Sequence, residues 1–166
     1  MSFKYTIEET QLEGVKVFTP DKFTDYRGTM WTYWEKDMNT PPQKISKFTH
    51  SRKNVLRGLH GDNETWKHIT CVYGAFYLVV VDYREDSPTY LQWISFTLDD
   101  KNCKSVLVPP GFLNGHLCLS DECVFHYTQS YPNEYVDWQD QMSVNWNDPA
   151  LKINRPVTNP ILSEKD

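Results

Sequence analysis

A histidine flanked by glycines is the first feature of this sequence that could carry chemistry. His60 lies in the segment 57–62, which reads RGLHGD. Because glycine has no Cβ, the backbone around His60 can approach a ligand closely. A neutral imidazole, with an ordinary pKa of about 6.5, can accept a proton near pH ~7. The segment therefore indicates either a general base or a hydrogen-bonded structural histidine, and Arg57 is either a phosphate clamp or a surface ion-pair residue.

Two further segments place polar side chains at alternate positions. Asn114 and His116 follow the rigid turn 109–111, which reads PPG. Side chains of a strand alternate between its faces, so both residues can face the same side. The same alternation puts Tyr127 on one face and His126 on the other. A structural interpretation also fits, with Asn114 in a loop hydrogen bond and Tyr127 in packing.

Strand signals dominate the chain, and helix signals are scarce. Strands are predicted over 15–18, 30–34, 68–73, 75–83, 90–98, 105–108, 115–119 and 123–128. The valine run within 75–83 predicts burial on both faces, and the segments 115–119 and 123–128 predict a hairpin. Residues 140–166 are rich in Pro, Asn and Asp. They predict an irregular tail with short helical turns that wraps the body of the protein.

Strands at this spacing predict a single all-β domain, a jelly roll or a similar barrel. Such a barrel has a mouth in which side chains from alternate positions can surround a ligand. The elements that must position His60, Asn114, His116 and Tyr127 are therefore strands that line the mouth.

The bulk properties of the 166-residue chain exclude several classes of protein. A net charge of −5 and the lack of a basic face argue against a nucleic-acid partner. The first residues contain no apolar region typical of a signal peptide, and no apolar run reaches the ~20 residues that span a bilayer. The four cysteines, which predict reduced thiols in a cytoplasmic protein, show no CxxC pairing. They are Cys71, Cys103, Cys118 and Cys123.

Five segments, taken in order, give the chain a resemblance to a known family. They are 25–28 (DYRG), 53–60 (KNVLRGLH), 81–89 (VDYREDSPT), 110–112 (PGF) and 146–149 (WNDP). Together they resemble the dTDP-4-dehydrorhamnose 3,5-epimerases, and the resemblance covers nearly the whole chain. It implies a cupin jelly-roll barrel over residues 1–166, a homodimer, and catalysis without a metal or other cofactor. The expected substrate is a nucleotide-diphospho-4-keto-sugar.

The resemblance also implies a role for each candidate residue. His60 resembles the base that removes a proton beside the C4 ketone, and Tyr127 resembles the acid that returns one from the opposite face. Asp166 resembles the carboxylate that orients His60, and Lys67 the group that stabilises the enolate oxygen. Such chemistry requires a base within reach and a positive charge near the carbonyl oxygen. The expected substrate contacts are Arg57, Asn114, His116 and Arg27, the last of them in the site of the neighbouring subunit.

A metal site is the main alternative for the same polar residues. The candidate ligands are His60, Glu64, His68 and His116. Metal-binding cupins usually have a closely spaced histidine pair and a distant third histidine. Here there is no His-x-His pair, and Asn114 stands where the distant histidine is expected. The sequence therefore predicts no metal.

Several residues depart from the pattern of the dTDP-rhamnose enzymes. Asn114 replaces a histidine, His116 a phenylalanine, and Gly61-Asp62 an aromatic-Gln pair, while Leu78 stands where an acidic residue is common. These departures argue against the rhamnose substrate. The segments 60–62 (HGD), 111–116 (GFLNGH) and 160–163 (PILS) are together similar to the epimerases of GDP-4-keto-heptoses used in bacterial capsule synthesis, and they favour that substrate. Because His60 and Tyr127 are both present, inversion is expected at C3 and C5. The alternatives are a dTDP-4-keto-6-deoxyhexose 3,5-epimerase, a nucleotide-sugar ketoisomerase, a non-catalytic sugar-binding cupin and a metal-dependent cupin oxygenase.

Overall fold

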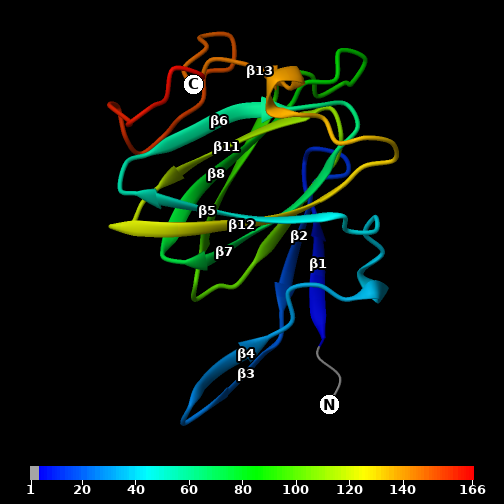
Figure 1. Cartoon of the computed structure of the whole chain (residues 1–166), viewed down its shortest axis with the longest axis vertical. Coiled ribbons are helices and arrows are strands. Elements are labelled where there is room, and N and C mark those ends of the chain that lie inside the picture. Colours follow the sequence, from blue (N-terminus) through cyan, green and yellow to red (C-terminus); the bar gives the residue numbers. More distant parts are fainter. Residues whose placement is uncertain (1–3) are drawn as a thin grey trace.

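Two antiparallel sheets pack face to face in the computed structural model, which describes residues 4–166 (Figure 1). The six-stranded sheet has the order β1 (Tyr5–Glu9), β2 (Lys16–Pro20), β10 (Ser105–Val108), β7 (Trp66–Tyr73), β12 (Glu122–Ser130) and β5 (Ile45–Arg52). The five-stranded sheet has the order β13 (Met142–Ser143), β6 (Leu56–Gly61), β11 (Phe112–Cys118), β8 (Ala75–Asp82) and β9 (Trp93–Asp99). This architecture confirms the predicted all-β jelly roll.

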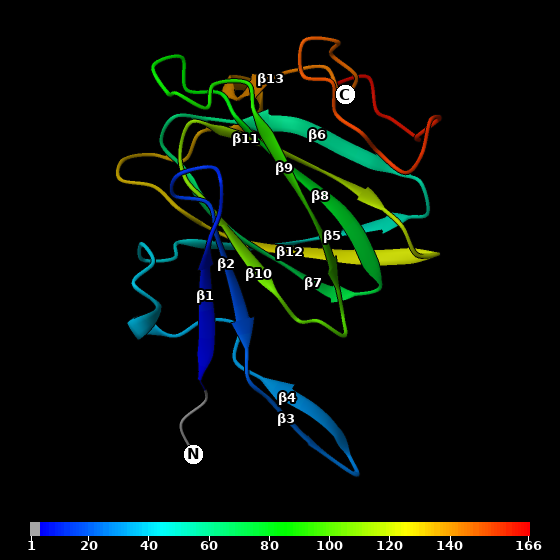
Figure 2. The same ribbon diagram turned by 180° about the vertical axis from the view of Figure 1, so that it is seen from behind.

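A two-stranded hairpin, β3 (Lys22–Asp25) and β4 (Gly28–Trp31), projects from the body of the protein (Figures 1 and 2). Short 3-10 turns cover Lys36–Met38 and Trp138–Asp140. The second of these lies at the start of the predicted tail. Within residues 4–166, no helix has the length and apolar character needed to cross a membrane.

Several predicted strands agree closely with the structure. The segments 15–18, 68–73, 75–83 and 105–108 correspond to β2, β7, β8 and β10. The strand predicted over 90–98 begins only at Trp93, because the preceding residues form a turn in which Leu91 has a φ of 69°. The strand predicted over 30–34 ends at Trp31, and β1, β3, β5 and β6 were not predicted.

The predicted hairpin between 115–119 and 123–128 is wrong. The strand β11 pairs with β6 and β8, whereas β12 pairs with β5 and β7 in the other sheet. The chain crosses between the sheets after Cys118, whose backbone atoms bond with Val55 and Asn54 on the neighbouring connection. Because of this crossing, β11 and β12 contribute apolar side chains to the main core from opposite sheets, as Cys118 and Phe125 show.

The main core fills the space between the sheets, and a second apolar layer covers the outer face of the five-stranded sheet. In β8, Leu78 and Val80 belong to the inner core while Val79 and Val81 belong to the outer layer. This arrangement confirms the prediction of a strand buried on both faces. Leu151, from the tail, completes the outer layer.

The end of the tail is attached to the start of β6. Ile161 forms a parallel bridge with Val55, its N–H donates to the Asn54 carbonyl at 2.8 Å, and its carbonyl accepts from the Leu56 N–H at 3.0 Å. These main-chain bonds bring the last residues of the tail beside the strand that carries His60. Local structure at residues 54–56 therefore determines where Asp166 lies.

Candidate active site

A cavity of about 140 Å³ between the two sheets brings together most of the residues predicted from the sequence. Its walls come from β5, β6, β7, β11 and β12, so each sheet supplies part of the lining. The residues that line it are Thr49, Arg57, His60, Lys67, Asn114, His116, Phe125, Tyr127, Gln129 and Gln141.

A register shift explains why Arg57 and His60 face the same cavity although they are three residues apart. His60 pairs with Asn114, while Arg57 pairs with His116 only two residues further along β11. Plain alternation would place side chains three positions apart on opposite faces of the strand. An irregularity of this kind brings them onto the same face. Gly58 lies within it at a φ of 113°, where a Cβ would come 2.5 Å from the Cα of Gly115. Glycine is required here both for its conformation and for the close approach of the strands.

Both nitrogen atoms of the His60 ring are hydrogen-bonded. Nε2 lies 3.0 Å from Oδ1 of Asp166, and Nδ1 lies 3.1 Å from Oγ of Ser143. Since a carboxylate only accepts, the bond to Asp166 places the proton on Nε2 and leaves the lone pair on Nδ1. Burial lowers the pKa of His60, and the Asp166 bond offsets part of that effect. The imidazole is therefore neutral near pH ~7 and able to accept a proton.

Asp166 is held by several donors besides His60. Its Oδ1 accepts from the Gly58 N–H at 3.1 Å, and its Oδ2 accepts from the Ser163 N–H at 3.2 Å and the Ser163 hydroxyl at 2.8 Å. Burial alone would raise the pKa of Asp166, but these hydrogen bonds outweigh it and hold the pKa below its ordinary value. Asp166 is thus an ionised and immobilised acceptor for the His60 ring.

Lys67 is a buried cation that has one side-chain partner among residues 4–166. Its Nζ donates to Oδ1 of Asn114 at 2.9 Å, and both residues line the cavity. Burial lowers the pKa of Lys67 to about 8, an effect that the negative charge of Asp62 partly opposes. An ammonium group has three hydrogens, so the bond to Asn114 leaves donors for a ligand. A desolvated cation of this kind stabilises negative charge that develops on a nearby oxygen.

Tyr127 belongs to the other sheet and faces the same cavity. The alternation along β12 points Phe125 and Tyr127 toward the cavity and His126 away from it, as predicted. His126 instead bonds to Ser46, with 2.8 Å between Nε2 and Oγ. Burial raises the pKa of Tyr127 above its ordinary value, although Lys47 acts in the opposite sense. The phenol therefore stays protonated near pH ~7 and can donate a proton.

His116 is buried in the cavity wall. Its ring stacks on that of Phe125, with 4.1 Å between the centroids and 13° between the planes. Burial lowers the pKa of His116 to about 3, so this ring is neutral and adds no charge to the site. The predicted pair Asn114 and His116 does face one side of β11, as the period of two requires.

A known protein family matches nearly the whole chain. The family model described as dTDP-4-dehydrorhamnose 3,5-epimerase matches residues 9–166. The chain belongs to this family.

Relatives and solved structures extend over nearly the whole chain. The dTDP-4-dehydrorhamnose 3,5-epimerase of Shigella flexneri is 34% identical over 95% of this chain and 91% of its own. The crystal structure of the Bacillus anthracis enzyme, with TDP and PPi bound, has a TM-score of 0.92 at 32% identity and covers 98% of this chain and 97% of its own. The Legionella pneumophila enzyme, in complex with dTDP-4-keto-L-rhamnose, has a TM-score of 0.91 at 29% identity, with coverages of 98% and 90%.

Arg27 is the one predicted site residue of this epimerase-family chain that lies outside the site. It sits at the exposed turn of the β3–β4 hairpin and pairs with Asp25, with 2.6 Å between Nη2 and Oδ2. The hairpin extends away from the sandwich in Figure 1. Contact with a ligand in a second subunit therefore remains a prediction.

Of the four candidate metal ligands, His60 and His116 line the active-site cavity, whereas Glu64 and His68 do not. Among residues 4–166, the structure contains no group of three or more His, Cys, Asp or Glu side chains placed to hold a metal ion. His68 lies on the face of β7 opposite to Lys67, where its Nε2 bonds to the Ser105 hydroxyl at 2.7 Å. The four cysteines are buried and unpaired.

Sequence reasoning missed several residues of the site. Ser143 contacts His60 from the short strand β13, and no local pattern in the sequence marks it. Gln129 could have been found, because it follows Tyr127 by two residues and so shares its face of β12. Thr49 lies on β5, a strand that was not predicted.

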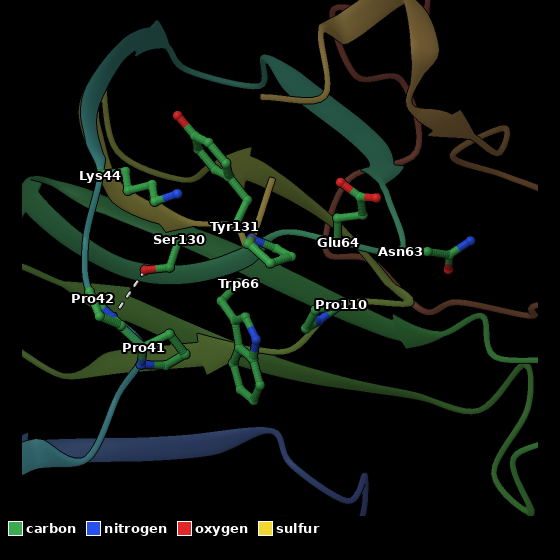
Figure 3. A pocket seen from close by; sticks show the side chains of 10 residues that line it. Pro41, Pro42, Lys44, Asn63, Glu64, Trp66, Pro110, Ser130 and Tyr131 are labelled. Atoms are coloured by element: carbon green, nitrogen blue, oxygen red, sulfur yellow. Dashed lines mark hydrogen bonds between the residues drawn. The ribbon is translucent and has the colours of Figure 1, made fainter. Parts of the chain in front are cut away.

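A larger cavity of about 700 Å³ lies next to the site but contains none of these residues (Figure 3). Trp66 and Ser130 line it, and each directly neighbours a residue of the active-site cavity, Lys67 or Gln129. Adjacent residues of a strand face opposite sides, so the two cavities are on opposite faces of β7 and β12. Four prolines make its wall largely apolar: Pro41, Pro42, Pro110 and Pro132.

Proposed function

We propose that the protein epimerises a nucleotide-diphospho-4-keto-sugar at carbons beside the ketone. The observation that carries the proposal is the placement of His60 and Tyr127 on different sheets across one cavity, with Lys67 in the same lining on the sheet of Tyr127. Inversion needs a base on one face of the sugar ring and an acid on the other, because return of the proton to the face it left produces no change. Family membership supports the same reaction.

In the proposed mechanism, His60 removes the proton alpha to the C4 ketone, and the electron pair moves onto the ketone oxygen. Lys67 stabilises the resulting enolate by charge and hydrogen bonding. Tyr127 then delivers its phenolic proton to the opposite face of the same carbon. Asp166 stabilises the imidazolium formed at His60. In the free protein the Ser143 hydroxyl lies at Nδ1 of His60, so the substrate must displace it.

The substrate that the comparisons favour is a dTDP-4-keto-6-deoxyhexose. The Legionella relative was solved with dTDP-4-keto-L-rhamnose, and the Bacillus relative was solved with TDP. The names of the relatives do not support the GDP-4-keto-heptose expected from the sequence, for which the replacements at Asn114 and His116 are the remaining argument. Inversion at both C3 and C5 is proposed from the 3,5-epimerases, although a Streptomyces niveus relative, 33% identical, is named a 3-epimerase.

The test is proton NMR in D₂O with dTDP-4-keto-6-deoxyglucose and, separately, a GDP-4-keto-heptose. Loss of the C3 and C5 proton signals with one compound establishes a 3,5-epimerase and identifies the nucleotide, while loss at one carbon identifies a single-centre epimerase. The control is His60→Asn, which we expect to abolish exchange while keeping the fold. Full exchange in that variant contradicts the mechanism. A product in which the carbonyl group has moved to another ring carbon, with no centre inverted, would indicate a ketoisomerase. No exchange with either compound would favour a sugar-binding protein without activity.

We further propose that the protein acts as a cytoplasmic homodimer in which Arg27 reaches the cavity of the second copy. The four unpaired cysteines support a reducing compartment. The exposed position of the hairpin that carries Arg27 supports a contribution of Arg27 to the site of the other subunit. A mixture of two variants that we expect to be inactive, Arg27→Ala and His60→Asn, tests whether Arg27 acts in the site of the other subunit. We expect recovery of about a quarter of the wild-type activity, from the one complete site of each mixed dimer. No recovery means that Arg27 does not act between subunits.

A further inference from the structure

Gln129 is a buried polar residue to which the mechanism above assigns no role. Its side chain lines the active-site cavity, yet the residue is only 1% exposed. Its Oε1 atom finds no hydrogen-bond partner within the described part of the chain. A buried acceptor without a partner destabilises the folded protein, so buried amides are nearly always hydrogen-bonded. An unpaired acceptor at a cavity wall indicates that a ligand supplies the missing donor.

The position of Gln129 defines which part of a ligand it meets. It lies directly opposite Lys67 in the pairing of β12 with β7, and it follows Tyr127 on the same face. Lys67 offers hydrogens, one of which goes to Asn114. This corner of the cavity therefore has an unfilled acceptor beside a cation that retains free donors.

We infer that Gln129 determines sugar specificity by accepting a hydrogen bond from a hydroxyl group of the bound sugar. The inference rests on the proposed function, in which Lys67 contacts the ketone oxygen. A ketone has no hydrogen to donate, so it cannot satisfy Gln129. The donor must be a hydroxyl close to that ketone. In a 4-keto-6-deoxyhexose it is the hydroxyl on C3, because C5 carries a methyl group, whereas a 4-keto-heptose can also supply a hydroxyl from the substituent of C5. A site built to bond a hydroxyl discriminates strongly against an analogue that lacks it, because its own polar group is left unpaired.

Binding of stable, non-keto analogues tests the inference without requiring catalysis. Calorimetric titration with the 4-deoxy-4-fluoro analogues of dTDP-glucose and GDP-mannose, which like the ketone have no hydrogen-bond donor at C4, selects the nucleotide that binds more tightly. That series is then compared with its 3-deoxy and 6-deoxy sugars. We expect wild-type protein to bind one of the deoxy sugars about tenfold more weakly than the parent. Loss of affinity at C3 assigns the ring hydroxyl, and loss at C6 assigns the hydroxyl of the C5 substituent.

Variants of Gln129 separate this role from a structural one. Gln129→Leu should bind the parent and the deoxy sugar equally, whereas Gln129→Glu, which keeps an acceptor of the same shape, should retain the tenfold preference. Thr128→Val is the matched control, because Thr128 lies on the same strand but faces away from the cavity and bonds to Tyr33. Equal weakening of every sugar in Gln129→Leu, or no preference in the wild type, overturns the inference. Failure of wild-type protein to exchange protons in D₂O is a separate result that tests only the proposed function.

Discussion

The Nε2 atom of His60 lies 3.0 Å from the Oδ1 atom of Asp166, although the two residues are 106 positions apart in the chain. The contact depends on the attachment of the tail to the start of β6 through Ile161. His60, the proposed base, and Asp166, the carboxylate bonded to it, are therefore positioned by one local piece of main-chain pairing. Lys67 and Tyr127 reach the same cavity independently, from strands of the other sheet.

Replacement of Asp166 by Asn should separate binding from catalysis. The amide oxygen can still accept from the Gly58 N–H, but the NH2 group that replaces Oδ2 cannot accept from the Ser163 N–H. The neutral amide also no longer stabilises a protonated His60 and does not enforce its tautomer. We expect kcat to fall by ~10²-fold or more while the Kd of a non-keto nucleotide sugar stays unchanged. Parallel calorimetry and rate measurements check this. An equal loss of affinity would instead assign Asp166 to substrate binding.

The pH dependence of kcat/KM should have limbs from His60 and Lys67. The pKa of His60 is lowered by burial, so the base becomes available as the pH rises through a value below ~6.5. The pKa of Lys67 is about 8, so its positive charge is lost as the pH rises through that value. We expect a bell-shaped profile whose alkaline limb falls near pH 8. In Lys67→Arg the guanidinium stays charged, so an unchanged alkaline limb would assign that limb to another group.

Replacement of Asp62 by Asn should move the alkaline limb alone. The Oδ1 atom of Asp62 accepts from the N–H groups of Glu64 and Thr65, and an Asn side chain can accept the same bonds. The turn is therefore kept while the negative charge that raises the pKa of Lys67 is removed. We expect the alkaline limb to shift to lower pH with the acid limb in place. Thermal unfolding provides the check that the fold is retained, and a limb that does not move would exclude Asp62 as the partner charge.

His116 and His68 should make the protein sensitive to acid. Burial lowers the pKa of each to about 3, below the ordinary value of 6.5. The unfolded chain therefore binds protons that the folded protein does not, and stability present above pH ~6.5 is lost as the pH falls. In His116→Phe, which preserves the stacking on Phe125, one such proton disappears. Below pH ~6, we expect the free energy of unfolding of this variant to fall less steeply with pH than that of the wild type. The two slopes should differ by about 1.4 kcal/mol per pH unit. Urea unfolding at several pH values and fixed protein concentration measures the slope, and identical slopes for both proteins would contradict the prediction.

The parts of the fold that follow from local pattern were predictable. The valine run of β8, and the alternation that directs Tyr127 and His126 to opposite faces, are properties of a few consecutive residues. The exchange of sheets between β11 and β12 was not predictable in this way. A short connection such as 119–121 fits a hairpin as well as a crossing, and the outcome depends on which distant strands pair with β11 and with β12.

In the candidate site, too, some residues could be predicted from the sequence and others depend on tertiary contacts. The family resemblance directed attention to His60, Lys67, Tyr127 and Asp166, and the structure brings all four to one place. The role of Ser143 depends on the position of β13 beside β6, which is a tertiary contact with no mark in the local sequence.

His60, the proposed base, belongs to the five-stranded sheet and Tyr127, the proposed acid, to the six-stranded sheet, so the separation of the two sheets sets how far apart they lie. Side chains that never touch a ligand maintain this separation, among them Phe76 from one sheet and Ile69 from the other. If Tyr127 is the proton donor, we therefore expect the volume of the hydrophobic core to influence which carbon of the sugar lies in line with it. Changes of core volume that leave every polar group of the site intact give evolution a route between enzymes that invert two centres and enzymes that invert one.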